Sequence, residues 1–441
     1  MPIAKARSRK EGRCEVRCAR GAKKGSSAPA RTLPQYLRII RIHHCKCTSK
    51  LPYYLHGCPP APRLGHVFGC FPSSLWANTD NIFVQCSFIP PLPPLLPPFP
   101  PSQKKKQMSE SASKKQKTTA TQFEQLAACT TIVADTGKID QIKKFQPTDA
   151  TTNPSLILQA ANLPEYAELV KNAALYGKTN GGEDINDQLS LAIDNVCVAF
   201  GTEISKVIPG YVSTEVDARL SFDVEQSVRR AKRIIEMYEA NGVGRDRVLI
   251  KLATTWEGIQ AAKILKKEGI ECNMTLLFSM AQAVAAAEED VKLISPFVGR
   301  IRDWWMKSSG RSEVYSAQED PGVLSVHAIY NYYKTHGYNT IVMGASFRSI
   351  GEVQMLAGCD RLTIAPKWLE MLQTSTEPLP VQLSAETAAS KCDLPKMDVD
   401  EAKFRWMMNE DAMATEKLAE GIRKFSVDIV KLENILRELM N

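Results

Sequence analysis

Lys251 is a charged residue inside a run of residues that is typical of a buried β-strand. It stands in LIKLATT (249–255), between Ile250 and Leu252. Lysine is rarely buried completely, because an ammonium group leaves water at a large cost unless it is paired or loses its proton. In one interpretation, the side chain lies at a strand end and reaches solvent. In the other, it stays buried among apolar neighbours, loses its proton, and becomes a nucleophilic amine.

Polar side chains occur late in seven consecutive β-like runs of the chain. They are Asp135, Asn153, Glu215 with Asp217, Lys251 with Thr254 and Thr255, Asn273 with Thr275, Ser295 with Arg300, and Ser346 with Arg348. Any one of them alone is more typical of a helix cap or of a hydrogen-bonded core residue. Their repetition at the same place in successive runs instead favours a shared site.

Eight β-like runs alternate with helical stretches from about residue 120 onward, as in a parallel sheet covered by helices. The runs are 131–137, 149–154, 207–217, 247–255, 271–279, 292–300, 339–348 and 361–366. This pattern predicts an α/β fold of the (β/α)₈ TIM barrel type, whose active site lies at the carboxyl ends of the strands. An open doubly wound sheet is the alternative, but the G-x-G-x-x-G turn expected there does not occur.

Two helices are predicted from apolar residues that recur at three- or four-residue steps. One covers 224–242 and ends at Asn241-Gly242. The other is a long C-terminal helix that we expect to pack on the barrel, without a cofactor role; its apolar residues are Leu418, Ile422, Phe425, Ile429, Leu432, Ile435 and Leu439.

A serine and two arginines near the ends of the sixth and seventh runs predict an anion site. Ser346 and Arg348 are two residues apart, so strand alternation predicts that they point the same way. An arginine beside a hydroxyl suits a phosphate, and barrels often bind phosphate near strands seven and eight. We expect Arg300 to make a second charged contact. The alternative is that both arginines pair with surface acids.

The first 107 residues differ in composition from the rest of the chain. They contain 18 Lys+Arg against 3 Asp+Glu, a net charge of +15, whereas the remainder contains 38 against 45, a net charge of −7. Their run PPLPPLLPPFPPSQKKK (90–106) favours extended polyproline. We therefore predict a disordered, basic, Pro/Cys-rich extension over 1–107 and a catalytic domain over 108–441, with Met108 as the functional start.

Composition also bears on metals, membranes and partners. HHCKC (43–47) fits no standard zinc spacing, and no run is suited to a transmembrane helix. Nucleic acid is an unexpected partner, because the basic extension lacks RNA-binding motifs. After Met108 the cysteines are odd in number and show no paired spacing, which predicts reduced thiols and a cytoplasmic protein; they are Cys129, Cys197, Cys272, Cys359 and Cys392.

Several stretches together resemble the transaldolase family over about residues 120–440. They are VADTG (133–137), DATTNPSLI (149–157), STEVDARLS (213–221), LIKLATTWEGI (249–259), CNMTLLFS (272–279), ISPFVGRI (294–301) and GASFR (344–348). The resemblance implies a (β/α)₈ enzyme of the pentose phosphate pathway that acts on sugar phosphates without cofactor or metal. It would transfer a dihydroxyacetone unit from sedoheptulose 7-phosphate to glyceraldehyde 3-phosphate. A homodimer is also implied.

The resemblance further implies a role for each candidate residue. Lys251 would form the Schiff base, and Asp135 would be the general base. Glu215 and Thr275 would hold the water that carries protons, and Asn153 and Asn273 would bind sugar hydroxyls and the enamine. The remaining residues would bind substrate or its phosphate; they are Ser295, Arg300, Ser346 and Arg348. Phe297 is expected to shield the enamine from water, with plain barrel packing as the alternative.

Two other functions stay open at this point. A fructose 6-phosphate aldolase would use much the same lysine but would release dihydroxyacetone instead of transferring it. From a different class, the chain would be a nucleic-acid-binding or scaffold protein, recruited by its basic extension and carrying a vestigial barrel. An assay with and without an acceptor aldose distinguishes the aldolase from a transaldolase. Salt-sensitive RNA retention tests the nucleic-acid-binding alternative.

Overall fold

Eight parallel strands close into a barrel in the computed structural model, which describes residues 120–441. The strands are hydrogen-bonded in sequence order, and β8 pairs with β1. They are β1 (Thr131–Asp135), β2 (Asp149–Thr151), β3 (Val212–Glu215), β4 (Val248–Ala253), β5 (Cys272–Leu277), β6 (Leu293–Pro296), β7 (Ile341–Gly344) and β8 (Arg361–Ile364). Each lies inside a predicted run, which confirms the TIM barrel. The predicted extension over 1–107 lies outside the described residues.

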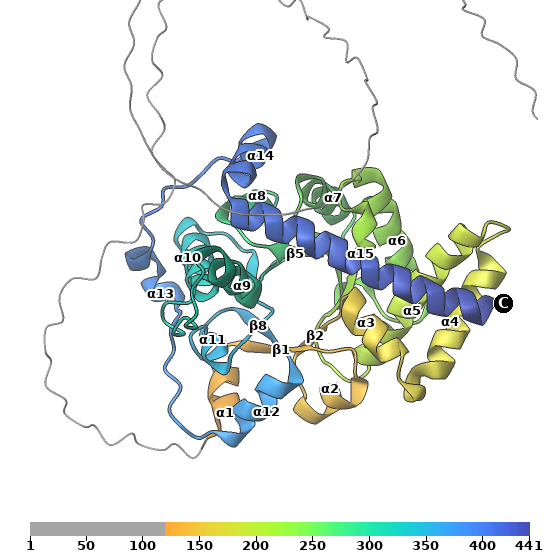
Figure 1. The fold of residues 1–441 in the computed structure, drawn as a ribbon, viewed down its shortest axis with the longest axis horizontal. Helices are drawn as coiled ribbons and strands as arrows, with labels where there is room; N and C mark the ends of the chain where they lie inside the picture. The colour runs from red at the N-terminus through yellow and green to blue at the C-terminus, as the bar shows by residue number, and fades with distance from the viewer. Residues whose placement is uncertain (1–119) are drawn as a thin grey trace, which may run out of the picture. The chain divides into compact units, whose positions relative to one another are not determined.

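Helices surround the barrel (Figure 1). At least one follows every strand: α2 (Ile139–Phe145), α3 (Pro154–Ala161), α6 (Val224–Ala240), α7 (Trp256–Lys267), α8 (Met280–Glu288), α9 (Val298–Ser309), α11 (Ile350–Gln354) and α12 (Pro366–Thr374). Further helices are α1 (Gln122–Ala127), α4 (Ala167–Asn180), α5 (Ile185–Ser205), α10 (Pro321–His336), α13 (Ala385–Ala388), α14 (Glu401–Glu410) and α15 (Ala412–Met440). Short 3-10 turns are η1 (Pro164–Tyr166), η2 (Ala218–Leu220), η3 (Arg245–Arg247) and η4 (Ala389–Lys391).

Strand β4 shows how a barrel strand is buried on both faces. All six of its residues are buried. Ile250 and Leu252 belong to the core between strands and helices, whereas Leu249 belongs to a separate cluster in the lumen with Val133, Leu293 and Met343. Alternate residues of a strand point to opposite faces. Lys251, two residues beyond Leu249, is therefore directed into the lumen above this apolar layer.

The pairing register places charged and polar residues next to Lys251. In β3, Glu215 is level with Lys251, and in β5, Asn273 is level with it on the other side. Neighbouring parallel strands present residues in register on the same face. The register therefore brings three polar residues from three successive strands together at one level of the lumen.

Every strand ends before its predicted run does, and the difference is largest for β6 and β7. Strand β6 ends at Pro296 and β7 at Gly344, so Arg300 lies in the first turn of α9 and Arg348 lies in the loop before α11. Ser346 has a φ of +63°, in the left-handed region. Strand alternation therefore does not apply to Ser346 and Arg348, because the backbone there is not extended.

The two predicted helices are confirmed, as α6 and α15. Helix α15 contacts β5, α3 and α9, and Figure 1 shows it, in dark blue, crossing in front of the barrel. Gly421 permits a close approach, because a Cβ at this position would lie 2.6 Å from Cδ2 of Leu276 in β5. Among residues 120–441, no helix combines the length and hydrophobicity that a membrane span requires.

Candidate active site

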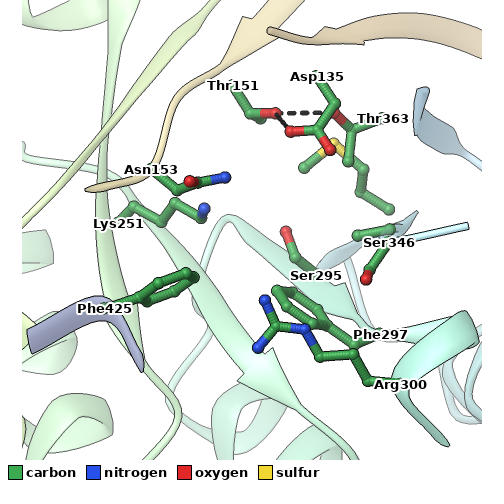
Figure 2. Close-up of a pocket in the computed structure, with 12 residues that line it drawn as sticks. Asp135, Thr151, Asn153, Lys251, Ser295, Phe297, Arg300, Ser346, Thr363 and Phe425 are labelled. Atoms are coloured by element: carbon green, nitrogen blue, oxygen red, sulfur yellow. Dashed lines mark hydrogen bonds between the residues drawn. The ribbon is translucent and has the colours of Figure 1, made fainter. Parts of the chain in front are cut away.

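A cavity opens at the carboxyl end of the barrel strands, and seven of the predicted site residues line it. The close-up in Figure 2 shows the Lys251 amine, the Asp135 carboxylate and the Arg300 guanidinium directed toward the same space. The complete lining is Asp135, Thr151, Asn153, Lys251, Ser295, Phe297, Arg300, Met343, Ala345, Ser346, Thr363 and Phe425.

Lys251 is buried and paired. Its exposed fraction is 5%, and its Nζ lies 3.0 Å from Oε2 of Glu215. The amine also donates a hydrogen bond to the backbone carbonyl of Thr152 at 3.2 Å. The interpretation in which Lys251 reaches solvent from a strand end is therefore wrong. The polar partners of the amine are a carboxylate and a carbonyl, and the apolar layer of the lumen lies below it.

Glu215 is the acidic partner of this amine and is itself buried. Burial raises the pKa of Glu215, whereas the charge of Lys251 opposes that rise. Removal from water destabilises both members of a buried ion pair, which favours their neutral forms. The arrangement can therefore pass a proton between the amine and the carboxylate without exposing either group to solvent.

Asp135 ends β1 on the opposite wall of the cavity. Its Oδ1 accepts a hydrogen bond from the Thr151 hydroxyl at 3.4 Å, and Thr151 is 2.7 Å from the hydroxyl of Thr363 in β8 (Figure 2). Burial raises the pKa of Asp135, and the charge of Lys251 partly offsets this effect. A carboxylate with a raised pKa is a better proton acceptor than an exposed one, as a general base requires.

A hydrogen-bonded chain of neutral side chains crosses the lumen beside Lys251. Ser295 donates to Oδ1 of Asn273 at 2.6 Å, and Nδ2 of Asn273 donates to the Ser213 hydroxyl at 3.1 Å. The nearby hydroxyl of Thr275 is buried and has no hydrogen-bond partner in the described part of the chain. A buried hydroxyl of this kind is suited to binding a water molecule.

Asn153 is both a helix cap and a cavity residue. Its Oδ1 accepts a hydrogen bond from the backbone N–H of Leu156 at 3.0 Å, at the start of α3. The cap leaves the amide Nδ2 as a hydrogen-bond donor at the cavity. The cap interpretation and the site interpretation therefore both hold for this residue.

Arg300 brings a positive charge to the cavity and has no acidic partner there. Its guanidinium carbon lies 4.8 Å from the ring centre of Phe297 and 5.5 Å from that of Phe425. Within residues 120–441 it forms neither an ion pair nor a hydrogen bond. Burial, and then repulsion by Arg348, lowers the pKa of Arg300. A partly buried cation in contact with aromatic rings is suited to an anion.

Ser346 and Arg348 occupy different positions relative to the cavity. Ser346 lines it, whereas Arg348 is exposed and forms an ion pair with Asp303 at 2.8 Å. Arg348 Nη1 nevertheless lies 3.3 Å from the Ser346 hydroxyl. The alternative in which an arginine pairs with a surface acid therefore describes Arg348 but not Arg300.

Four predicted site residues lie outside the cavity lining, namely Glu215, Asn273, Thr275 and Arg348. The first two contact lining residues directly, through Lys251 and Ser295. Other polar residues at the strand ends have structural roles. Thr255 caps α7, Thr254 bonds the carbonyl of Thr275, and Asp217 caps η2 and pairs with Arg219.

Five lining residues were not predicted, namely Thr151, Met343, Ala345, Thr363 and Phe425. Thr363 had a detectable signal, since it is a polar residue between Leu362 and Ile364 in a strand and must face away from them. Phe425 had none beyond helical periodicity. Its place in the cavity depends on where α15 crosses the barrel.

The described residues contain no group of three or more His, Cys, Asp or Glu placed to hold a metal ion. The five cysteines of this region are free thiols.

The site brings together an amine, two carboxylates and an arginine without an acidic partner. An amine nucleophile with these neighbours suits a carbonyl compound that carries an anionic group.

Comparison with known proteins agrees with this chemistry. The family described as Transaldolase/Fructose-6-phosphate aldolase matches residues 132–436. A transaldolase of Kluyveromyces lactis is 59% identical over 333 residues, which cover 75% of this chain and 98% of that protein. A transaldolase of Saccharomyces cerevisiae is 56% identical over 334 residues, covering 75% of this chain and 99% of that protein. A transaldolase of Homo sapiens is 57% identical over 335 residues, covering 76% of this chain and 98% of that protein. At more than half identity over almost the whole length of these relatives, the chain belongs to the transaldolase family.

Proposed function

We propose that this chain is a transaldolase of the pentose phosphate pathway. It transfers a dihydroxyacetone unit from sedoheptulose 7-phosphate to glyceraldehyde 3-phosphate, giving erythrose 4-phosphate and fructose 6-phosphate. The observation that carries the proposal is the buried amine of Lys251, which lies beside Glu215 in a cavity that Asp135 and the unpaired Arg300 also line. Its relatives named as transaldolases support the choice of reaction.

The reaction begins at Lys251. Its neutral amine adds to the C2 carbonyl of the ketose and forms a carbinolamine, which loses water to give an iminium. Protons must reach the departing oxygen and leave the amine. Glu215, 3.0 Å from the amine, moves them together with a water held at the Thr275 hydroxyl. The unpaired hydroxyl of Thr275 supports this role.

Cleavage and transfer follow at the carbon chain. Asp135 takes the proton of the C4 hydroxyl while the C3–C4 bond breaks, and the electron pair of that bond passes to the iminium. An aldose leaves as its aldehyde, and a three-carbon enamine remains on Lys251. The enamine carbon then attacks the aldehyde of the acceptor, Asp135 returns the proton, and hydrolysis releases the new ketose.

The other polar residues orient the sugar phosphate. Asn153, Asn273 and Ser295 bind the sugar hydroxyls and the enamine. Arg300, Ser346 and Arg348 bind the phosphate. This assignment is supported by the free charge of Arg300 at the cavity and by the 3.3 Å approach of Arg348 to Ser346.

Covalent trapping tests the proposal. Borohydride reduction in the presence of fructose 6-phosphate should leave a three-carbon adduct on the peptide that contains Lys251, as detected by mass spectrometry. Lys251→Ala should abolish both the adduct and turnover. Lys263→Ala removes a lysine that is 42% exposed and pairs with Glu289, the residue that follows α8, so both the adduct and turnover should persist. An adduct on another lysine would refute the assignment.

Asp135→Asn should lower kcat by about 10²- to 10⁴-fold, the usual contribution of a general base. Borohydride should still trap an adduct, because Lys251 remains, but the adduct should carry the intact six-carbon chain, since cleavage of the C3–C4 bond is slowed. Since the base acts as the carboxylate, activity in the parent enzyme should fall as pH decreases through the raised pKa of Asp135. This acidic limb of the pH profile should disappear in the variant. Asp140→Asn, at an exposed acid in α2, is the control. An unchanged profile in Asp135→Asn would contradict the role.

In this proposal, Phe297 shields the enamine from water, so that the three-carbon unit is transferred to an acceptor and not released as dihydroxyacetone. Its ring packs edge-on against Phe278 at 5.6 Å and faces the cavity. Phe297→Tyr places a hydroxyl near the enamine, so more of it should be protonated and released as dihydroxyacetone, the product of a fructose 6-phosphate aldolase. The measurement is the ratio of free dihydroxyacetone to transferred product, with and without acceptor. Phe278→Tyr, outside the cavity lining, should leave that ratio unchanged; equal ratios in both variants would reduce Phe297 to barrel packing.

We further propose that the chain acts as a homodimer in the cytoplasm. The dimer rests on the family resemblance, and the compartment is supported by the free thiols of the described region. Sedimentation equilibrium of the purified chain should give twice the mass of one chain. A single-chain mass at micromolar concentration would exclude a stable dimer.

A further inference from the structure

A second group of charges, two of them buried and one partly buried, adjoins the loop between β7 and α11, and the reaction above does not use it. It consists of Arg302 in α9, Asp320 at the start of α10, and Glu352 in α11, and is called here the α9–α11 charge cluster. Glu352 is 0% exposed and Asp320 is 1% exposed. Arg302 Nη1 lies 2.8 Å from Glu352 Oε1, and its Nε lies 4.0 Å from Asp320 Oδ2. Burying charges is costly, so the cluster calls for an explanation.

Glu352 connects the cluster to the loop that carries Ser346. Its second oxygen, Oε2, accepts a hydrogen bond from the backbone N–H of Arg348 at 2.6 Å. The same carboxylate thus holds Arg302 through one oxygen and the loop backbone through the other. A short hydrogen bond to a buried carboxylate is among the stronger hydrogen bonds in proteins.

The loop needs such support, because Ser346 adopts a left-handed φ of +63°. This conformation is unfavourable for a residue other than glycine and persists only when its surroundings impose it. Helix α9 supplies two of the contacts, since Val298 N–H donates to Ala345 O and Gly299 N–H donates to Ser346 O, both at 2.9 Å. A Cβ on Gly299 would lie 2.5 Å from Ser346 O, so the two segments touch directly.

Helix α9 carries two arginines that face different regions. Arg300, in its first turn, faces the cavity, whereas Arg302 belongs to the α9–α11 charge cluster. Residues two apart on a helix point in different directions, so one helical turn presents one arginine to each region. The bond between Arg302 and Glu352 therefore ties the segment that carries Arg300 to the loop that carries Ser346 and Arg348.

We propose that Glu352 is a positioning residue for the phosphate site, which it builds by joining α9 to the β7–α11 loop through Arg302 and the Arg348 N–H. The inference rests on the proposed function, since it concerns the phosphate of the same substrates. Burial raises the pKa of Glu352 to about 7, and Asp320 adds to that rise while the Arg348 N–H and Arg302 oppose it. A carboxyl held at such a cost is more typical of a functional site than of plain packing.

The test compares phosphorylated and unphosphorylated acceptors on the full-length Glu352→Gln variant. The amide still accepts from Arg348 N–H but loses the charge that holds Arg302. KM for glyceraldehyde 3-phosphate should rise at least about tenfold, the effect of losing one charge-assisted contact. KM for glyceraldehyde, which has no phosphate, should change much less. Inorganic phosphate, titrated by calorimetry, should bind the variant correspondingly more weakly.

Asp194→Asn is the matched control. Asp194 is also a buried carboxylate, 3% exposed, and it pairs with Arg230 at 2.6 Å and Arg233 at 2.5 Å. It joins α5 to α6 and takes no part in the cavity lining. This variant should lose thermal stability without changing the ratio of the two KM values. Glu352 would have only a structural role if Glu352→Gln, like Asp194→Asn, lost thermal stability without changing the KM ratio, or if it raised both KM values equally.

Two further measurements keep the outcome decisive. If Glu352→Gln does not fold, Glu352→Asp keeps the charge but shortens the side chain, and it should show the same phosphate-specific loss to a smaller degree. Phosphate binding by calorimetry requires no turnover. Weakened phosphate binding in a chain that forms no borohydride adduct would therefore reject the proposed reaction and retain the role of Glu352. A normal adduct with unchanged phosphate binding would retain the proposed reaction and reject the role of Glu352.

Discussion

The contact between the Lys251 amine and the Glu215 carboxylate, buried together in the barrel lumen, is the interaction around which the rest of the site is organised. Each charge alone would cost several kcal/mol to remove from water. This desolvation cost is offset only if an opposite charge lies at the same level of the lumen. The register of β3 with β4 places Glu215 level with Lys251. Apolar residues fill the lumen below this pair and exclude water from it. The reactive groups therefore lie at the carboxyl end of the barrel.

The charged groups around the cavity differ in how they are paired. Lys251 pairs with Glu215, and Asp135 accepts a hydrogen bond from Thr151, whereas Arg300 has no ion-pair partner within residues 120–441. Aromatic rings around Arg300 stabilise its charge without neutralising it, so the guanidinium remains available to an anion. In the proposed reaction, the phosphate end of a substrate is held there while bonds change at its carbonyl end.

Most of the fold could be predicted, because its signals are local. Each strand lies within an apolar run bounded by helical stretches, and the periodicity of α6 and α15 is visible in the chain. Strand ends were less predictable. In 292–300 and 339–348 the apolar pattern continues into a helix start and a loop, where the backbone is no longer extended. Periodicity therefore identified Ser346 and Arg348 as neighbours but assigned their directions for the wrong reason.

The sequence by itself determined which residue types stand at the strand ends, and hence the candidates for the nucleophile, the acids and the anion-binding arginine. The tertiary structure alone decided what surrounds them. It placed Phe425 of α15 against Arg300, placed Glu215 beside the Lys251 amine, and bonded Glu352 to the backbone of the loop that carries Ser346. The physical reason is that strand position follows from short-range periodicity, whereas these contacts join distant segments whose approach depends on packing.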